Sequence, residues 1–287
     1  MPNQTMQLVQ TWAELNQVLP AGPRTVVMTM GALHQGHLDL VDQAAQLGQP
    51  VVVTIFVNPL QFGPTEDFQS YPRNLQADLA VLEGRGVSAV YAPAAADMYP
   101  QGQPDVSIKA GPAGRVFEGA ARPGHFDGVL TVVLKLLQRT AATTAIFGQK
   151  DAQQLALIQR MVSDLDLGVQ IQAVPTRRDL DGLALSSRNQ RLSPAARQVA
   201  LVLPRALEAG ASAAWAGQTL GAIRLAAHQV VNQAPAGFEL DYLEVVEPSG
   251  FTVPQAAYQG PALLIGAAIV DSVRLIDNWP IGVGATG

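Results

Sequence analysis

A run of apolar and β-branched residues passes directly into two histidines in the segment Thr25-Val26-Val27-Met28-Thr29-Met30-Gly31-Ala32-Leu33-His34-Gln35-Gly36-His37. Residues 25–30 have the composition of a buried strand, and apolar residues recur at helical spacing over residues 38–47. Gly31 stands between them, where glycine adopts backbone conformations that other residues avoid. The pattern predicts a strand-to-helix turn with both histidines at the start of the helix.

This turn is a candidate nucleotide-phosphate site. Unpaired N–H groups and a partial positive charge at a helix N-terminus favour anions. The histidine rings add hydrogen-bond donors, and Gly36 leaves room for a ligand to approach the backbone. Two other interpretations are open: the histidines stand at the helix end without a function, or they form part of a metal site. The metal interpretation is the weaker one, because the chain has no cysteine and its only other histidines are His125 and His228.

The composition argues against several classes of protein. A net charge of −5 disfavours nucleic-acid binding as the main function, since proteins with that function carry a basic face. The absence of cysteine excludes structural disulfides and a cysteine nucleophile, and it fits a reducing compartment. Residues 1–10 lack the basic and apolar regions of a signal peptide, and no apolar run approaches the ~20 residues that span a bilayer. We expect a cytoplasmic protein that binds no membrane.

Strand-like and helical segments alternate over the first two thirds of the chain. The apolar, β-rich segments are residues 25–30, 51–57, 88–91, 144–147 and 169–174, and the helical patterns between them are residues 38–47, 75–85, 128–139 and 152–165. Continuous apolar strands that alternate with helices predict an α/β fold with a Rossmann-like, doubly wound parallel sheet. In such sheets ligands bind at the carboxyl ends of the strands.

The pattern changes after Pro175, where a basic, turn-rich segment begins. We expect one domain over residues 1–175 and a smaller α+β domain over residues 176–287, with residues 176–189 crossing between them. In the second domain, helices are predicted near residues 194–209 and 220–232, and strands near residues 238–246, 263–269 and 273–277. Pro204 interrupts a helical run, where proline costs about 3 kcal/mol, so a kink or two shorter helices are expected there.

Amide side chains follow the second predicted strand. Asn58 and Gln61 begin a segment, residues 58–73, that is rich in turn formers. Its plain interpretation is a surface loop with a capped helix after it. Because the carboxyl ends of parallel strands share one edge of a sheet, the two amides could instead lie near the histidines. There they could hold the hydroxyls and carboxylate of a small polar acid without adding charge.

A lysine follows the fourth predicted strand in the segment Gly148-Gln149-Lys150-Asp151, and Gln154 lies one turn into the next helix. The plain interpretation makes Asp151 an N-cap and Lys150 a solvated cation. On the functional interpretation, Lys150 neutralises a phosphate oxygen and Gln154 contacts a substrate, since lysine carries a compact charge on a flexible stem.

Three further places have two interpretations each. Ser186-Ser187-Arg188-Asn189 is an ordinary turn or a pyrophosphate site, because hydroxyls and a bidentate guanidinium suit phosphates. Arg122 and His125 belong either to a structural loop or to a pocket wall. Asp78 is either a solvated helix carboxylate or a residue near the Mg²⁺ that accompanies a nucleotide.

The segment His34-Gln35-Gly36-His37 resembles the HIGH-type motif of the nucleotidyltransferase superfamily, and residues 30–37 resemble more narrowly the pantothenate synthetase family. Further strings in the same order resemble family segments, namely residues 58–73, 122–129, 147–155 and 186–189. Most of the matching residues lie in the N-terminal two thirds of the chain, and a few continue as far as residues 241–246. It implies an ATP-dependent ligase that joins pantoate to β-alanine through a pantoyl adenylate, and it implies a homodimer.

The resemblance also implies roles for individual residues. Catalysis is implied for His34, His37 and Lys150, and Mg²⁺ is implied near Asp78. The residues implied in binding pantoate or β-alanine are Asn58, Gln61, Tyr71 and Gln154. The residues implied in ATP binding are Met30, Gly31, Ala32, Leu33, His34, Gly36, His37, Gly148, Gln149, Lys150, Asp151, Arg177, Leu185, Ser186, Ser187 and Arg188. A loop, either residues 63–70 or the segment at Ser186, is expected to close over the adenylate.

The chain departs from the family pattern at three places. Arg177 occupies a usually apolar position that meets the nucleotide through its backbone, Asp179-Leu180 replaces Glu-Ala, and Ala77 replaces an acidic residue beside Asp78. Two rival functions are open, a nucleotidyltransferase acting on a phosphorylated acceptor and a non-catalytic nucleotide-binding regulator. The glutamine-lined loops and the small C-terminal domain count against the first. The retained phosphate-binding residues, His34, His37, Lys150 and Arg188, count against the second.

Overall fold

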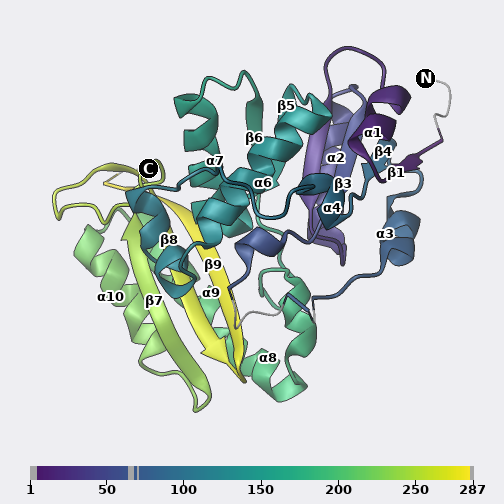
Figure 1. Ribbon diagram of the computed structural model, residues 1–287. Helices are drawn as coiled ribbons and strands as arrows, with labels where there is room; N and C mark the ends of the chain where they lie inside the picture. Colours follow the sequence, from purple (N-terminus) through teal and green to yellow (C-terminus); the bar gives the residue numbers. More distant parts are fainter. Residues whose placement is uncertain (1–4, 64–67, 70, 285–287) are drawn as a thin grey trace. The chain divides into compact units, whose positions relative to one another are not determined.

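The computed structural model describes residues 5–63, 68–69 and 71–284 (Figure 1). The chain forms two compact units. The first unit runs to Gln149 and resumes over Gln153–Pro175, and the second consists of Lys150–Ala152 and the residues from Thr176 onward. Of the loop at residues 63–70, one of the two expected to close over an adenylate, residues 64–67 and 70 lie outside the described residues.

A parallel sheet of six strands forms the centre of the first unit. Its order is β1-β4-β3-β2-β5-β6, and every neighbouring pair is parallel. The strands are β1 (Gln7–Val9), β2 (Thr25–Thr29), β3 (Val51–Ile55), β4 (Val87–Tyr91), β5 (Thr144–Gly148) and β6 (Gln170–Val174). The prediction of a parallel α/β sheet is confirmed. β1 was not predicted, because three residues are too few to show a periodic pattern.

Helices cover both faces of this sheet. They and the short 3-10 turns are α1 (Trp12–Val18), α2 (Gln35–Gln46), η1 (Pro59–Gln61), α3 (Leu75–Leu82), α4 (Ala95–Met98), η2 (Pro112–Arg115), α5 (Glu118–Ala121), α6 (His125–Thr140), η3 (Gln149–Asp151) and α7 (Ala152–Asp164). Val26 packs in a cluster with α1, α6 and α7, whereas its neighbour Val27 packs in a second cluster with α2 and α3. Because successive strand residues point to opposite faces, the sheet is doubly wound.

The strand order places the loop after β2 at a functional position. From β2 the chain continues to β3 and β4 on one side, while β5 and β6 lie on the other side. Connections after β2 and β5 therefore leave in opposite directions, and ligands of doubly wound sheets bind at such switch points. The two histidines follow β2 directly.

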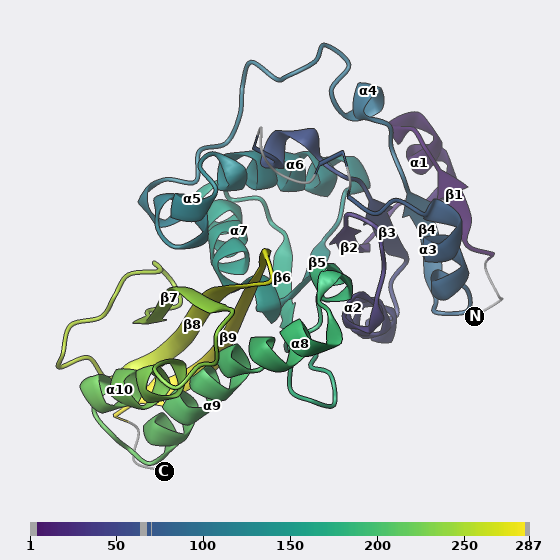
Figure 2. The same ribbon diagram turned by 90° about the horizontal axis from the view of Figure 1, so that it is seen from below.

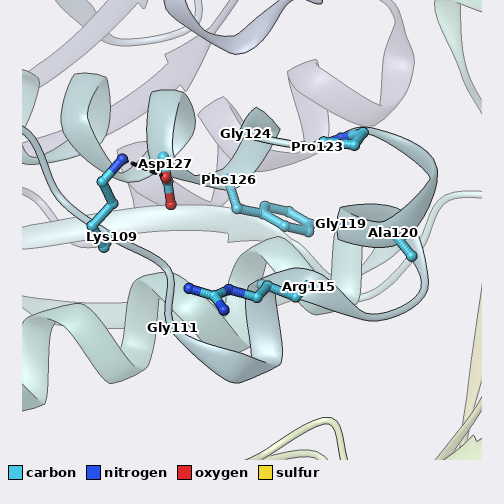
Figure 3. Close-up of a pocket in the computed structure, with 10 residues that line it drawn as sticks. Lys109, Gly111, Arg115, Gly119, Ala120, Pro123, Gly124, Phe126 and Asp127 are labelled. Atoms are coloured by element: carbon cyan, nitrogen blue, oxygen red, sulfur yellow. Dashed lines mark hydrogen bonds and ion pairs between the residues drawn. The ribbon is translucent and has the colours of Figure 1, made fainter.

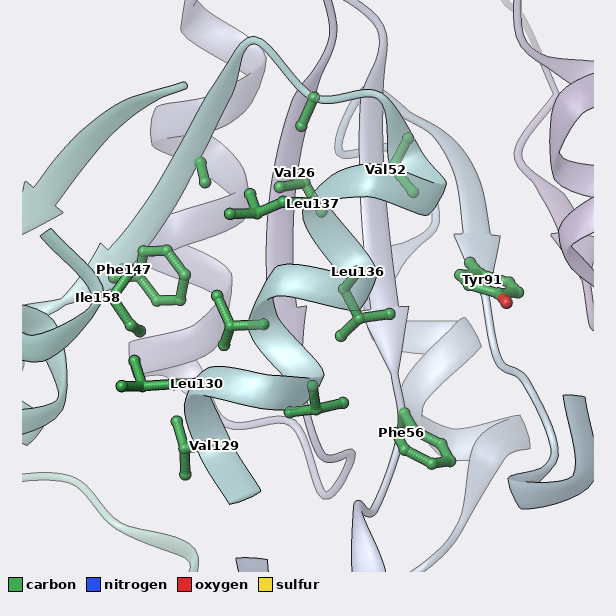
Figure 4. Packing of buried hydrophobic residues seen from close by; sticks show 14 of the residues in the cluster. Val26, Val52, Phe56, Tyr91, Val129, Leu130, Leu136, Leu137, Phe147 and Ile158 are labelled. Atoms are coloured by element: carbon green, nitrogen blue, oxygen red, sulfur yellow. The ribbon is translucent and has the colours of Figure 1, made fainter. Parts of the chain in front are cut away.

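Helix α6 fixes the loop that follows β3. Leu130 and Leu137 of this helix belong to the same buried apolar cluster as Val26 of β2 (Figure 4). Burying one such side chain stabilises the fold by roughly 1.5–3 kcal/mol. A Cβ atom at Gly128 of α6 would lie 2.2 Å from the carbonyl oxygen of Leu60, so η1 packs directly on this helix only because residue 128 is glycine.

A three-stranded antiparallel sheet forms the centre of the second unit, in the order β7-β8-β9 (Figure 2). The elements of this unit are η4 (Ser187–Arg191), α8 (Pro194–Ala200), α9 (Val202–Trp215), α10 (Leu220–Val231), β7 (Phe238–Val246), β8 (Gly260–Val270) and β9 (Val273–Val283). Leu207 of α9, Ile223 of α10 and Leu264 of β8 share one apolar cluster. The helices thus cover one face of the sheet, and the predicted α+β class is confirmed.

Two elements of this unit differ from the simplest sequence pattern. The helical run near residues 194–209 is split into α8 and α9, so Pro204 falls in the first turn of α9, where its missing N–H costs little. This confirms the expected break. β9 continues well past residue 277, because it is an edge strand in which Pro280 is tolerated. Asp277 and Asn278 therefore lie within a strand.

Candidate functional site

The histidine loop joins β2 to α2. Gly31 has a φ of +84° and Ala32 a φ of +51°, so the chain turns through left-handed conformations. His34 is the N-cap residue of α2, and Gly36 and His37 lie in the first helical turn, earlier than the predicted helix start. The ring centroids of His34 and His37 are 4.0 Å apart. The predicted placement of both histidines at the start of the helix is confirmed.

A backbone hydrogen bond indicates which ring nitrogen of His37 carries the proton. The N–H of His34 donates to Nδ1 of His37 at 3.3 Å. Since Nδ1 accepts this bond, the neutral ring carries its proton on Nε2; the tautomer is inferred from the hydrogen-bond partners. His37 therefore offers an N–H donor at a helix terminus whose own amides favour an anion.

Asp78 of α3 anchors the histidine loop. Its Oδ2 and Oδ1 atoms accept the N–H groups of Ala32 and Leu33 at 3.1 and 2.8 Å, and only 4% of the residue is exposed. A Cβ atom at Gly31 would lie 2.9 Å from Oδ2, so a glycine is needed there. The interpretation of Asp78 as a solvated helix carboxylate is wrong. Both oxygens anchor the loop, and the expectation that Asp78 lies near the Mg²⁺ of a nucleotide stays a prediction.

Buried amides hold the loop after β3. Asn58 is 1% exposed, and its Nδ2 donates to the carbonyl of Gly128 at 3.1 Å and to Oε1 of Gln61 at 3.2 Å. Its Oδ1 accepts from the hydroxyl of Tyr99 at 2.8 Å. Asn58 therefore holds this loop in place, and its expected contact with a substrate stays a prediction. Nε2 of Gln61 donates to Sδ of Met30 at 2.9 Å, which brings this loop to the histidine loop.

His125 and Arg122 support the main chain at Gln61. Nδ1 of His125 lies 2.8 Å from the carbonyl oxygen of Gln61, and its Nε2 lies 2.9 Å from Nη1 of Arg122. A guanidinium only donates, so Nε2 accepts and Nδ1–H donates to the carbonyl. His125 also borders a cavity described below, so the geometry agrees with both interpretations of this segment.

Two neighbouring glutamines on α7 differ in burial. Gln154, the predicted substrate contact, is half-buried. Gln153 is buried, and its Nε2 donates to the carbonyls of Ala113 and Val116 at 2.7 and 2.8 Å. Sequence reasoning missed this role of Gln153, because adjacent glutamines give the same signal until the buried face of the helix is known. Tyr71, also implied in substrate binding, is buried.

In the second unit, Lys150 lies in η3, the turn that follows Gly148 and Gln149. Its Nζ is 3.6 Å from Oδ1 of Asp151, and its side chain is 20% exposed. The carbonyl oxygen of Lys150 accepts a hydrogen bond from Nδ2 of Asn278 at 2.9 Å. The interpretation of Lys150 as a freely solvated cation is not supported, since most of the side chain is withdrawn from water.

A short hairpin over residues 177–185 leads to the predicted pyrophosphate segment. The N–H of Leu185 donates to the carbonyl of Arg177 at 2.9 Å. The guanidinium of Arg178 binds both carboxylate oxygens of Asp277, at 2.6 and 3.0 Å, and 2% of the Asp277 side chain is exposed. Burial raises the pKa of Asp277, and the hydrogen bonds and charge of Arg178 act in the opposite direction. The hairpin is thus fixed by a buried ion pair.

Ser186, Ser187 and Arg188 lie together at the start of η4. Oγ of Ser186 accepts the N–H of Arg188 at 3.3 Å, and Nδ2 of Asn189 donates to the carbonyl of Ala184 at 2.9 Å. All four residues from 186 to 189 are half-buried. The segment is therefore a capped, hydrogen-bonded turn that presents two hydroxyls and one guanidinium.

Two neighbouring cavities lie outside the histidine loop. One of about 320 Å³ is bordered by Gln61 and His125. The other, of about 430 Å³, is lined by Lys109, Arg115 and Asp127, and Nζ of Lys109 donates to Oδ2 of Asp127 at 2.9 Å (Figure 3). Neither cavity includes a residue of the histidine loop, so we assign neither to the nucleotide.

Two negative findings concern residues 5–63, 68–69 and 71–284. Within these ranges, no helix combines the length and the apolar character that crossing a membrane requires. Within the same ranges, no three His, Cys, Asp or Glu side chains are grouped so that they could hold a metal ion. Asp78 is accordingly not part of a protein metal cluster in this part of the chain.

Comparison with known proteins identifies the family. A family model described as Pantoate-beta-alanine ligase matches residues 4–280. The chain belongs to the pantoate-β-alanine ligase family. Pantothenate synthetase of Salinispora arenicola is 50% identical over 277 residues, which are 96% of this chain and 97% of that protein. The resemblance inferred from the motifs is confirmed.

Solved structures of this family match over nearly the whole chain. The pantothenate synthetase of Thermus thermophilus has a TM-score of 0.90 at 45% identity, covering 96% of this chain and 99% of that one. The pantoate-β-alanine ligase of Francisella tularensis, complexed with β-γ ATP and β-alanine, has a TM-score of 0.77 at 32% identity, with 99% of each chain covered. These matches agree with the parallel and antiparallel sheets described above.

Proposed function

We propose that this protein is an ATP-dependent ligase that condenses pantoate with β-alanine through an enzyme-bound pantoyl adenylate. Pantothenate, AMP and pyrophosphate are the products. The family membership supports this reaction, and the complex of the Francisella tularensis relative with β-γ ATP and β-alanine supports the substrates. The single observation that carries the proposal is the position of His34 and His37 at the N-terminus of α2, directly after β2 at the switch point of the sheet.

In the first step, a carboxylate oxygen of pantoate attacks the α-phosphorus of ATP. The bond from that phosphorus to the bridging oxygen breaks, and pyrophosphate leaves with the electron pair. Negative charge on the α-phosphate oxygens must be stabilised, and preorganised donors are the most effective means of doing so. We assign this role to His37 and His34 together with the amides of the first turn of α2.

Three residues of the second unit are proposed to bind the β- and γ-phosphates. Lys150 supplies a compact positive charge, and Ser187 and Arg188 supply a hydroxyl and a guanidinium from one turn. The remaining ATP contacts are assigned to the residues that frame these groups, namely Met30, Gly31, Ala32, Leu33, Gly36, Gly148, Gln149, Asp151, Arg177, Leu185 and Ser186. No protein nucleophile is needed, because the substrate carboxylate attacks phosphorus itself.

Pantoate is assigned to Gln61 and Gln154, with Tyr71 in the pocket wall. Gln61 already reaches the histidine loop through Met30, and half-buried Gln154 retains accessible surface. Asn58 is kept in the proposed pantoate site, where its hydrogen bonds to Gly128, Gln61 and Tyr99 support a role in holding Gln61. Neutral amides recognise hydroxyl and carboxylate groups by hydrogen bonding without adding charge near the phosphates.

In the second step, the amine of β-alanine attacks the carbonyl carbon of the adenylate. The carbon–oxygen bond to AMP breaks, AMP leaves with the electron pair, and the amine loses a proton as the amide forms. Water would attack the same carbon, so the adenylate must be shielded. We propose that residues 176–287 form a smaller domain that closes over the site, with the segment at Ser186 shielding the adenylate.

Mg²⁺ is proposed to arrive bound to ATP. Mg²⁺ commonly keeps several waters and binds substrate phosphates, so the chain does not require a complete protein cage for it. This fits the described residues, which contain no cluster of three metal-binding side chains and in which the Asp78 oxygens serve backbone amides. When bound, the ion would neutralise part of the phosphate charge.

A homodimer in the cytoplasm is also proposed, on the family resemblance. Light scattering coupled to size-exclusion chromatography tests the dimer. A mass corresponding to one chain of 30.3 kDa at assay concentration would overturn it.

Product analysis tests the function directly. The protein is incubated with ATP, Mg²⁺, pantoate and β-alanine, and each organic substrate is omitted in turn. We expect AMP and pantothenate in equal amounts only when both organic substrates are present. A nucleotide conjugate of a phosphorylated acceptor would indicate the rival nucleotidyltransferase, and binding of ATP without turnover would indicate a regulator.

A further inference from the structure

Asn278 contacts the main chain of Lys150 although 128 positions separate them in sequence. Its Nδ2 donates to the carbonyl oxygen of Lys150 at 2.9 Å, and the residue is 3% exposed. Both residues belong to the second unit. The contact is buried and specific to one backbone group of the proposed phosphate-binding lysine.

The rest of Asn278 is held in place. Its N–H donates to Oδ1 of Asp277 at 2.7 Å, and its carbonyl accepts from Nη2 of Arg178 at 3.1 Å. In the sheet it is paired with Ile265 of β8. An amide on such a fixed backbone has little freedom, so the position of Nδ2 is set by the sheet.

Lysine alone is a poorly positioned catalytic group. Its ammonium sits on a flexible four-carbon stem, and the volume that Nζ can reach depends on where the backbone is held. Fixing the carbonyl of Lys150 limits that volume, and the 3.6 Å approach of Nζ to Asp151 limits it further. Misplacement of a catalytic group by about 1 Å can cost on the order of 100-fold in rate.

We propose that Asn278 is a positioning residue for Lys150, acting through the Lys150 carbonyl on the step that forms the adenylate. This inference rests on the proposed function, in which Lys150 binds the ATP phosphates. Asn278 itself touches no substrate in this scheme. The same strand segment also fixes Arg178 through Asp277, so one edge strand holds both the lysine and the hairpin that precedes Ser186.

A double-mutant cycle tests the proposal by ATP–pyrophosphate exchange in the presence of pantoate. Asn278→Ala removes the donor, and Asn278→Asp keeps the shape but puts an acceptor beside the carbonyl. Asn232→Ala is the control, because Asn232 is exposed and none of the described residues receives a hydrogen bond from its side chain. Rates are normalised to the folded fraction, measured by near-ultraviolet circular dichroism of the tryptophans, so that partial unfolding cannot imitate an effect on catalysis.

Both Asn278 variants are expected to lower the exchange rate at saturating substrate by roughly 10- to 100-fold. The KM for pantoate should stay within about twofold, because pantoate is assigned to other residues. In a Lys150→Ala background, Asn278→Ala should cause no further loss, since its effect passes through Lys150. Asn232→Ala should leave the rate unchanged.

Two outcomes would overturn the positioning role. One is an exchange rate in Asn278→Ala equal to that of the unmodified protein. The other is an equal loss in the presence and absence of Lys150, which would make Asn278 a general structural residue. Absence of pantoate-dependent exchange in the unmodified protein would instead contradict the proposed function, so the two failures are distinguishable.

Discussion

Oδ1 of Asp78 accepts the backbone N–H of Leu33 at 2.8 Å, one residue before His34. The second carboxylate oxygen accepts the N–H of Ala32 at 3.1 Å. A charged acceptor thus fixes two successive peptide groups of a loop whose residues Gly31 and Ala32 both have positive φ. This contact joins α3 to the histidine loop and holds the start of α2 in a defined conformation.

Replacing Asp78 with asparagine should weaken this anchor. An amide supplies one oxygen and places an NH₂ group against the second N–H, so one charge-assisted hydrogen bond is lost. We expect a loss of roughly 1–3 kcal/mol in unfolding free energy, together with slower pyrophosphate exchange. Thermal unfolding and the exchange assay measure the two effects.

The matched control for Asp78→Asn is Asp42→Asn, which removes a partly exposed ion pair with Arg85 and should change stability by less than about 1 kcal/mol. The anchoring role also predicts that added Mg²⁺ does not restore the Asp78→Asn rate. Recovery at high Mg²⁺ with an unchanged melting temperature would show a metal ligand instead.

Gly128→Ala should displace the loop that carries Gln61. The added Cβ would lie 2.2 Å from the carbonyl oxygen of Leu60 and 2.7 Å from the Gln61 nitrogen, so η1 must move away from α6. Overpacking of this kind costs roughly 1–3 kcal/mol, and the KM for pantoate should rise because Gln61 moves. Gly221→Ala is the control, since it is a helical glycine with open space around it. Equal stability and an equal KM for pantoate in the two variants would contradict the close packing of η1 on α6.

Arg197 should stabilise the hairpin over residues 177–185 in a pH-dependent way. Its guanidinium binds Asp179 at 2.6 Å and Asp181 at 2.8 Å, and the hydrogen bond from Arg197 lowers the pKa of Asp181 below its usual value. A carboxyl whose folded pKa is lowered stabilises the protein above its unfolded pKa. That stabilisation is lost as the pH falls through the folded pKa.

The melting temperature of the unmodified protein should therefore exceed that of Arg197→Ala at pH 7, and the gap should close toward pH 3 and below. Because the ion pairs are partly exposed, the effect at pH 7 should be about 1 kcal/mol or less. Arg205→Ala, at an exposed position on α9, should show no such dependence. A difference in melting temperature that grows as the pH falls would contradict the stabilising role of the Arg197 ion pairs.

The sheet and the histidine turn were predictable because their signals are local. β2 is a continuous apolar run, and the turn residues Gly31, His34 and Gly36 follow it within the same short segment. The end of β9 was not predictable in this way, because tolerance of Pro280 depends on the strand lying at a sheet edge.

The supporting contacts of the site depend on residues far apart in sequence. Asn58 binds Gly128 and Tyr99, which lie 70 and 41 positions away, and Asn278 lies 128 positions from Lys150. An isolated asparagine after a strand gives the same sequence signal whether it binds substrate or shapes a loop. The contact of Asn58 with Gly128 depends on the packing of η1 against α6, which no local sequence pattern contains.

ATP–pyrophosphate exchange in the presence of pantoate tests the central claim most directly. We predict that the unmodified protein catalyses exchange only when pantoate is present. His37→Ala and Lys150→Ala should each lower the rate by roughly 100-fold or more, while circular dichroism shows an unchanged fold. Exchange that survives both substitutions at the original rate would contradict the proposed roles of His37 and Lys150 in forming the adenylate.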